Sequence, residues 1–195
     1  MNVFDQLIDV DKKGNITYNR WIEWDHIGIP NQSQIVRDIA RILLALQFHC
    51  LTCTALDGCY FVDNNKPEYP QHERCDCKII SIDKSTLTRK ANAYCDIRKF
   101  TEYVFSNQSK GKNQIFYNLG FSKQDSQHLQ TEYCKQALKN YLNGNYLLKN
   151  LDMHGQRIAI PITLKGKTFY SGWMICPEGK IQNITPFGGK INEKI

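Results

Sequence analysis

Residues 145–187 read NYLLKNLDMHGQRIAIPITLKGKTFYSGWMICPEGKIQNITPF, and this stretch decides the fold. Four runs rich in β-branched and aromatic residues follow one another here, at residues 145–153, 157–166, 167–176 and 180–187. The sequences LKGK and PEGK between the later runs carry the glycine that a tight hairpin turn needs. The stretch therefore predicts a four-stranded antiparallel sheet.

The residues before these strands have helical patterns. Two short amphipathic segments occupy residues 96–106 and 112–121. A longer helix is expected over residues 122–145, with Ser122 or Asp125 as its N-cap and Gly144 as its end. Helices followed by strands predict an α+β fold, in which the helices pack on the four-stranded antiparallel sheet.

The N-terminal part of the chain has its own elements. Residues 31–50 carry the clearest helical pattern, residues 77–82 read as a strand, and residues 83–95 read as a linker. We place a domain boundary in this linker. A module at residues 1–85 is therefore expected to precede a basic domain at residues 92–195.

Charge is divided unevenly between these two parts. Residues 1–77 carry 7 Lys/Arg and 11 Asp/Glu, a net charge of −4, whereas residues 78–195 carry 18 Lys/Arg and 8 Asp/Glu, a net charge of +10. A concentration of positive charge favours a polyanionic partner. We therefore expect the basic domain to contact nucleic acid, and we expect no small-molecule cofactor.

Two observations bear on the compartment. No stretch reaches the roughly 18 apolar residues that a membrane span needs. The first fifteen residues carry acids where a signal peptide carries bases. We expect no membrane partner and a cytoplasmic site of action, with delivery as part of a larger system left open.

Residues 50–77 hold five of the eight cysteines and one histidine. Clustered cysteines in a reducing compartment favour a metal over disulfides, and zinc commonly takes two closely spaced pairs of ligands. The spacing predicts one structural Zn²⁺ bound by Cys50, Cys53, His72 and Cys75. Cys77 remains the alternative to His72, and Cys59 is expected to be a packed thiol. A redox CxxC is the weaker interpretation, because no thioredoxin-like βαβ pattern surrounds it.

The cysteine segment also carries a family pattern. Residues 50–61 match C-x2-C-x-x-L-D-G-x-x-F, and residues 70–77 match P-x-H-x-x-C-x-C. With these motifs, residues 35–80 resemble the zinc-binding-like C-terminal part of phage minor head (head morphogenesis) proteins. The chain departs from that family at Gln71 and Asp76, where proline and arginine are usual.

A second resemblance covers residues 97–187. Its landmarks are KFTEYVFSNQSKGKNQIFYNLGF, LDMHGQRIAIPITLKG and SGWMICPEGKIQNITPF. They resemble a small uncharacterised domain of phage head-like proteins and bacterial polymorphic toxins, which looks like the barnase, EndoU or RelE type of ribonuclease. The resemblance implies a metal-independent ribonuclease toxin acting on RNA, with transfer RNA as a candidate substrate. It also implies an acidic immunity protein as a partner and delivery by a larger phage or secretion system.

The basic domain offers residues for such chemistry. Metal-free RNA cleavage needs a base for the 2′-hydroxyl, an acid for the leaving 5′-oxygen and cations for the charge on phosphorus. We assign Lys112 and Arg157 to the phosphate and His154 or Thr185 to the scissile bond. Two alternatives remain open: a phage protein that binds nucleic acid or a partner without cutting, and a small virion-associated or host-takeover protein.

Overall fold

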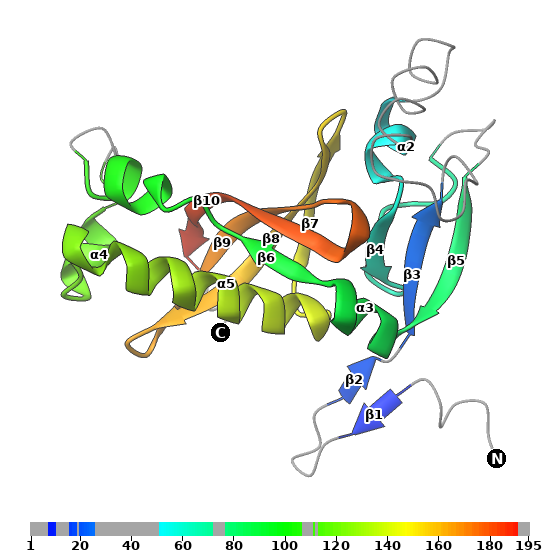
Figure 1. Cartoon of the computed structure of the whole chain (residues 1–195), viewed down its shortest axis with the longest axis horizontal. Coiled ribbons are helices and arrows are strands. Elements are labelled where there is room, and N and C mark those ends of the chain that lie inside the picture. The colour runs from blue at the N-terminus through cyan, green and yellow to red at the C-terminus, as the bar shows by residue number, and fades with distance from the viewer. Residues whose placement is uncertain are drawn as a thin grey trace.

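The computed structural model of the 195-residue chain describes residues 8–10, 16–18, 20–25, 51–71, 77–106, 111 and 113–190. These residues form a mixed α+β structure, as the sequence predicts, with a larger and a smaller sheet (Figure 1). The helix expected over residues 31–50 lies outside the described residues.

The larger sheet has five strands, β6 (Asn92–Tyr94), β7 (Leu147–Asp152), β8 (Gly155–Leu164), β9 (Lys167–Ile175) and β10 (Lys180–Lys190). Their order is β6-β10-β9-β8-β7. The four expected strands are all present and pair antiparallel, but β6 adds a parallel edge strand next to β10. The prediction of a purely antiparallel four-stranded sheet is therefore wrong, because the expected linker contributes a fifth strand.

Two tight connections in this sheet contain left-handed backbone. Lys165 and Gly166, between β8 and β9, have φ angles of 46° and 79°. Glu178 and Gly179, in the short helix η4 (Pro177–Gly179) between β9 and β10, have φ angles of 62° and 78°. Two consecutive positive φ angles give a turn the twist that a hairpin requires. The turns expected at LKGK and PEGK are confirmed.

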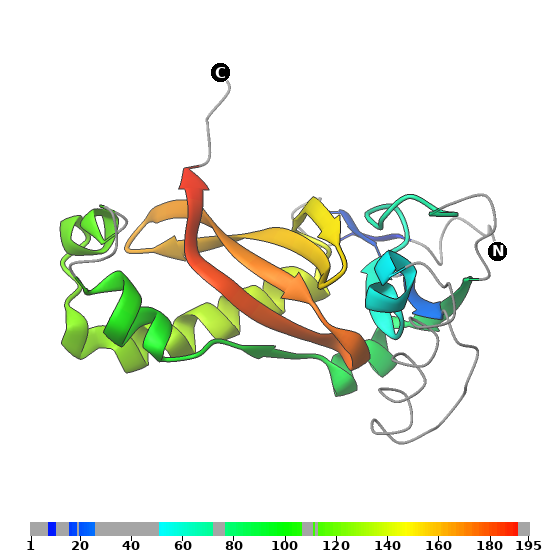
Figure 2. The same ribbon diagram turned by 90° about the horizontal axis from the view of Figure 1, so that it is seen from above.

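Helix α5 (Ser126–Leu142) covers one face of the larger sheet (Figure 2). Its buried side chains recur every four residues, which places them in one stripe toward the strands: Leu129, Tyr133, Ala137 and Tyr141. No helix in the described part of the chain is long enough and apolar enough to cross a membrane.

The ends of the α5 segment follow the predicted capping residues. Ser122 and Asp125 form a capping box around the short helix η3 (Lys123–Asp125), which leads into α5. Gly144 lies just beyond the helix with a φ of 69°, a conformation in which glycine has no steric penalty. The predicted start and end of the long helix are therefore confirmed.

The two short helical segments are η2 (Lys99–Val104), which has wider π-type turns, and α4 (Gln114–Asn118). Their aromatic rings pack on Tyr133 of α5 and on Phe169 of β9. The centroids of Phe100 and Tyr133 lie 5.1 Å apart, and those of Phe116 and Phe169 lie 6.1 Å apart. These edge-on ring contacts close that end of the core.

The smaller sheet places β3 (Arg20–Asp25) between β4 (Cys59–Val62) and β5 (Lys78–Asp83), all antiparallel. Strands β1 (Ile8–Val10) and β2 (Ile16–Tyr18) form a separate pair. Helix α2 (Leu51–Leu56) precedes β4, and α3 (Lys84–Lys90) follows β5. The linker prediction for residues 83–95 is wrong, because Asp83 accepts from the Thr86 backbone N–H at 2.9 Å and caps α3.

One apolar core extends through both sheets. The ring of Tyr141 in α5 lies 5.2 Å from that of Trp21 in β3, and its hydroxyl donates to the backbone oxygen of Tyr60 in β4 at 2.8 Å. These contacts join the smaller sheet to the helix that covers the larger one. The division into domains at residues 1–85 and 92–195 stays a prediction.

Candidate nucleic-acid interface

The face of the larger sheet that points away from α5 carries polar and aromatic side chains. In β8 the side chains of Ile158, Ile160 and Ile162 are buried, so the alternating Arg157 and Thr163 point to the opposite face, where both are exposed. Figure 2 shows α5 along one side of the sheet. We call the opposite side the open face.

Four open-face residues form a row across four strands, which we call the transverse row. Arg157 of β8 pairs with Met174 of β9, Met174 pairs with Gln182 of β10, and Gln182 pairs with Tyr94 of β6. Paired residues on neighbouring strands point to the same face and lie about 5 Å apart, so the row spans about 14 Å. The two ends are accessible, since the Arg157 side chain is 45% exposed and Tyr94 is 47% exposed.

Tyr94 has a cation beside its ring. The Nζ atom of Lys180 in β10 lies 5.7 Å from the centroid of the Tyr94 ring. An exposed aromatic ring can stack on a nucleobase, and a neighbouring ammonium group can contact the attached phosphate. The amide of Gln182, next in the row, supplies both a donor and an acceptor for a base edge.

At the other end of the row, the Asp152 carboxylate links two residues that the sequence singles out. Its Oδ2 atom lies 3.1 Å from Nη2 of Arg157, and its Oδ1 atom accepts from the backbone N–H of His154 at 2.8 Å. Asp152 pairs with Gly155, so His154 lies in the two-residue turn that joins β7 to β8. Asp152 therefore bridges the side chain of Arg157 and the backbone N–H of His154, and we call these three residues the Asp152–His154–Arg157 cluster.

Thr185 lies on the open face but outside this cluster. It is opposite Gly172 of β9, which is opposite Ala159 of β8, two residues along from Arg157. Strand spacing and rise place the Cα atoms of Thr185 and Arg157 about 12 Å apart. The Thr185 hydroxyl donates to the backbone oxygen of Phe187 at 3.1 Å. Lys112, the fourth predicted residue, lies outside the described residues.

Sequence reasoning missed several open-face residues. Asp152 could have been found, because a tight turn between β7 and β8 folds it back toward Arg157. Lys180 and Gln182 could have been assigned to one face by alternation along β10. Tyr94 had no such signal, since a strand of only three residues is recognised from its neighbour rather than from its own pattern.

Only one of the four predicted zinc ligands lies within the described residues. Cys53 is buried in α2, whereas Cys50, His72 and Cys75 fall outside. Among the side chains that the structure describes, no group of three or more His, Cys, Asp or Glu residues is placed to hold a metal ion. The zinc site stays a prediction. Cys59 is fully buried, with its Sγ 3.8 Å from the backbone oxygen of Ile175, which confirms the expected packed thiol.

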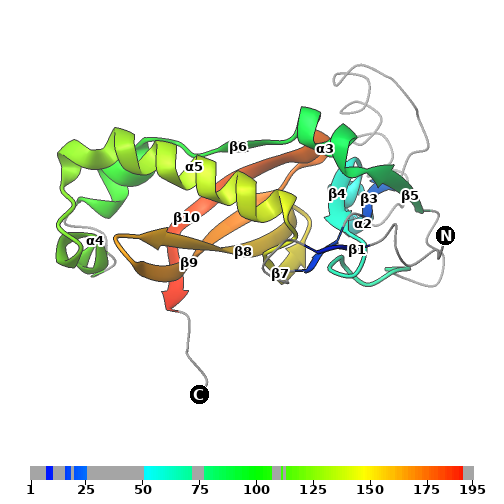
Figure 3. The ribbon, with the colours of Figure 1, turned by 90° about the horizontal axis from the view of Figure 1, so that it is seen from below.

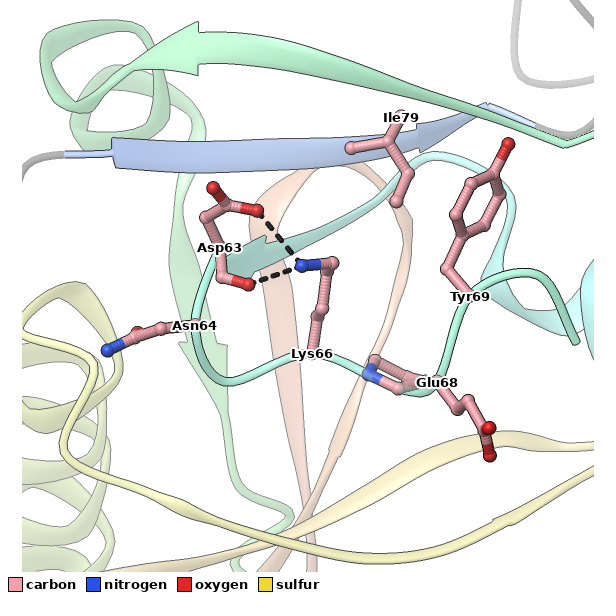
Figure 4. Close-up of a pocket in the computed structure, with 7 residues that line it drawn as sticks. Asp63, Asn64, Lys66, Glu68, Tyr69 and Ile79 are labelled. Carbon is pink, nitrogen blue, oxygen red and sulfur yellow. Dashed lines mark hydrogen bonds and ion pairs between the residues drawn. The ribbon is translucent and has the colours of Figure 1, made fainter.

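A polar recess of about 530 Å³ lies beside β5 (Figure 4). The Nζ atom of Lys66 donates to the Oδ1 atom of Asp63 at 3.0 Å and to its backbone oxygen at 2.5 Å. The Tyr69 hydroxyl donates to the backbone oxygen of Cys77 at 2.8 Å. These groups hold the loop together, so the recess is a weaker candidate for an anion site than the open face.

Comparison with known proteins yields one match. A family model described as "Domain of unknown function (DUF6883)" matches residues 86–187, just over half of the chain. The matched segment runs from α3 into β10 and therefore contains the whole transverse row. No curated protein and no solved structure matches the chain.

Proposed function

Because the chain belongs to the DUF6883 family, whose function its description leaves unknown, we propose from its own residues that it binds RNA on the open face and cleaves it without a metal ion. The observation that carries this proposal is the transverse row, which has an arginine at one end and a tyrosine with a neighbouring lysine at the other. Charge, hydrogen-bonding groups and a stacking surface are the three elements that single-stranded RNA sites combine.

The row suits a single strand better than a duplex. Its length of about 14 Å matches a few extended nucleotides, and its aromatic end needs an unpaired base. Met174 and Gln182 in the middle offer a soft apolar contact and a base-edge hydrogen bond. The net charge of +10 over residues 78–195 supports binding through its attraction for phosphates.

The Asp152–His154–Arg157 cluster is the candidate for the chemical step. We assign Arg157 to the scissile phosphate, where its guanidinium offsets the charge that develops on phosphorus. We assign the His154 imidazole as the base that takes the proton of the attacking 2′-hydroxyl, while solvent water protonates the leaving 5′-oxygen, so that a 2′,3′-cyclic phosphate and a free 5′-hydroxyl form. Asp152 holds Arg157 in place, and it also fixes the backbone of the turn that carries His154. Thr185 becomes a binding residue in this proposal.

We further propose an origin, a site of action, a substrate and a partner for this ribonuclease. The protein is a phage-derived or polymorphic-toxin-type ribonuclease, acting in the cytoplasm, with transfer RNA as a candidate substrate and an acidic immunity protein as a partner. A structural zinc braces the N-terminal module through Cys50, Cys53, His72 and Cys75. The buried, helix-borne position of Cys53 is compatible with a closed structural site.

The test is cleavage of total cellular RNA by the purified protein with and without EDTA. Cleavage should persist in EDTA and fall about 100-fold in Arg157→Ala, the usual loss when one charge-stabilising group is removed. Arg89→Ala is the matched control, because Arg89 is an exposed arginine on α3 outside the transverse row. Equal activity of the two variants would contradict the assignment of Arg157.

The second candidate function is RNA binding without cleavage, favoured by the stacking end of the row at Tyr94. In that case RNA stays intact, yet it binds with an affinity that falls as salt rises. Loss of this binding in Arg157→Ala would keep the open face as the interface and discard the catalytic role. If the protein neither cleaves nor binds RNA, the virion-associated or host-takeover alternative remains.

A further inference from the structure

A groove on the helical side of the molecule combines leucine and lysine side chains. It has a volume of about 440 Å³ and is lined by residues of α3 and of the C-terminal half of α5. Figure 3 shows these two helices next to each other. Its lining residues are Lys84, Thr88, Lys135, Leu138, Lys139, Leu142 and Asn143. Because the buried stripe of α5 points to the sheet, these residues lie on a different side of the helix from the sheet contact.

The groove has an apolar floor and a basic rim. Leu138 and Leu142 are half-buried and lie four residues apart on α5, so they stack along the helix axis. Lys135 and Lys139 are exposed beside them, and Lys84 comes from α3 on the other side. Three of the seven lining residues are lysines and none is acidic. The Glu132 carboxylate lies at the edge of the groove, with its Oε1 atom 4.0 Å from Nζ of Lys135.

We propose that this groove docks an acidic amphipathic helix of a partner protein. Such a helix places apolar side chains on the leucine floor and carboxylates on the lysine rim. Residues 135–142 of α5 rise about 11 Å, which matches two turns of a partner helix. An RNA backbone would use the lysines but gain nothing from the leucine floor, so charge and apolar surface together favour protein.

The docking site is separate from the proposed RNA site. The transverse row lies on the open face, whereas the groove lies beyond the helix that covers the opposite face. A partner in the groove therefore leaves the open face accessible, and the two ligands should bind together. This inference concerns a second surface and does not depend on the chain being a ribonuclease.

The experiment uses the full chain and a defined probe. The probe is a fluorescent helical peptide of about four turns, with leucines on one face and glutamates flanking them. A scrambled peptide of the same composition keeps the charge but loses the apolar face. Binding is measured by anisotropy for the wild type, for the double variant Lys135→Glu/Lys139→Glu and for the control Lys123→Glu. All three replaced lysines are exposed, so folding is checked simply by circular dichroism.

The proposal expects the amphipathic peptide to bind the wild type and Lys123→Glu alike, and to bind the double variant at least about tenfold more weakly. Hydrogen exchange should slow in residues 84–90 and 126–142, and a single-stranded RNA should not displace the peptide. Equal binding of the scrambled peptide, or equal binding by the double variant, would overturn the proposal. Displacement of the peptide by RNA that protects the same segments would assign the groove to nucleic acid instead.

Discussion

Raising the pH above about 10 should progressively destabilise this protein, because three tyrosines that are buried in the folded state ionise more readily in the unfolded chain. The hydroxyls of Tyr133, Tyr141 and Tyr146 donate to backbone oxygens at 3.0, 2.8 and 2.9 Å. Burial raises the pKa of each hydroxyl above its ordinary value of 10. The folded state therefore keeps these protons at a pH where the unfolded chain releases them.

The sign and size of the effect follow from proton linkage. Below pH 10 both states are protonated, so the contribution of each tyrosine to stability is fully present. Above pH 10 the unfolded chain binds fewer protons, and the free energy of unfolding falls by roughly 4 kcal/mol per pH unit for three such groups. Against a typical stability of about 5–15 kcal/mol, the folded state should be lost within a few pH units. Burial also raises the pKa of the Cys95 thiol to about 12, so this group likewise lowers the free energy of unfolding as the pH rises.

The assay is urea unfolding at several pH values between 7 and 11, followed by circular dichroism. Tyr133→Phe should cost about 1 kcal/mol at pH 7, since its hydrogen bond to Pro186 is lost. Between pH 10 and 11 the free energy of unfolding should fall less steeply with pH in this variant than in the wild type. The difference in slope should be about a third of the slope that the three tyrosines contribute together. A wild-type stability that does not change over this interval, or an identical slope in Tyr133→Phe, would refute the reasoning.

Three further predictions concern the open face and the cysteine segment. A Cβ on Gly172 would lie 2.8 Å from Cγ2 of the β-branched Thr185, so Gly172→Ala should lower the free energy of unfolding in urea by about 1–3 kcal/mol. In a Thr185→Ser background, which lacks this methyl group, the same substitution should cost much less. Equal costs in the two backgrounds would refute the contact between these two residues. Tyr94→Ala should weaken single-stranded RNA binding by about 1–3 kcal/mol through lost stacking, measured by anisotropy, whereas Tyr117→Ala, at an equally exposed tyrosine of α4, should not. Metal analysis should find about one zinc per chain, and Cys53→Ser should lose both the metal and much of the stability; full zinc retention in that variant would remove Cys53 from the ligand set.

The elements that could be predicted from the sequence are those with a strong local pattern. The four later strands follow from β-branched runs and from turns in which Gly166 and Gly179 adopt left-handed backbone. Helix α5 follows from its capping residues, Ser122 and Asp125, and from Gly144 at its end. The fifth strand and α3 could not be predicted in the same way, because β6 has three residues and is defined by its parallel pairing with β10.

The candidate site was predictable only in part, for a related reason. Arg157 is recognisable as a charge that alternates with buried isoleucines, and His154 as a turn residue next to it. The distance between Arg157 and Thr185 depends on strand order, since β9 lies between their strands. Tyr94 joins the row only because its strand, β6, pairs with β10, which follows some ninety residues later in the sequence. Such long-range pairing leaves no local signal in the sequence.

The measurement that tests the central claim most directly is a photo-crosslink between the full chain and a short single-stranded RNA containing 4-thiouridine. Mass spectrometry then identifies the crosslinked peptides. If RNA lies on the open face, crosslinks should map to the strands of the transverse row, above all to the peptides containing Tyr94 and Met174, and should disappear in high salt. Crosslinks confined to α3 and α5, or spread evenly over the chain, would contradict the account.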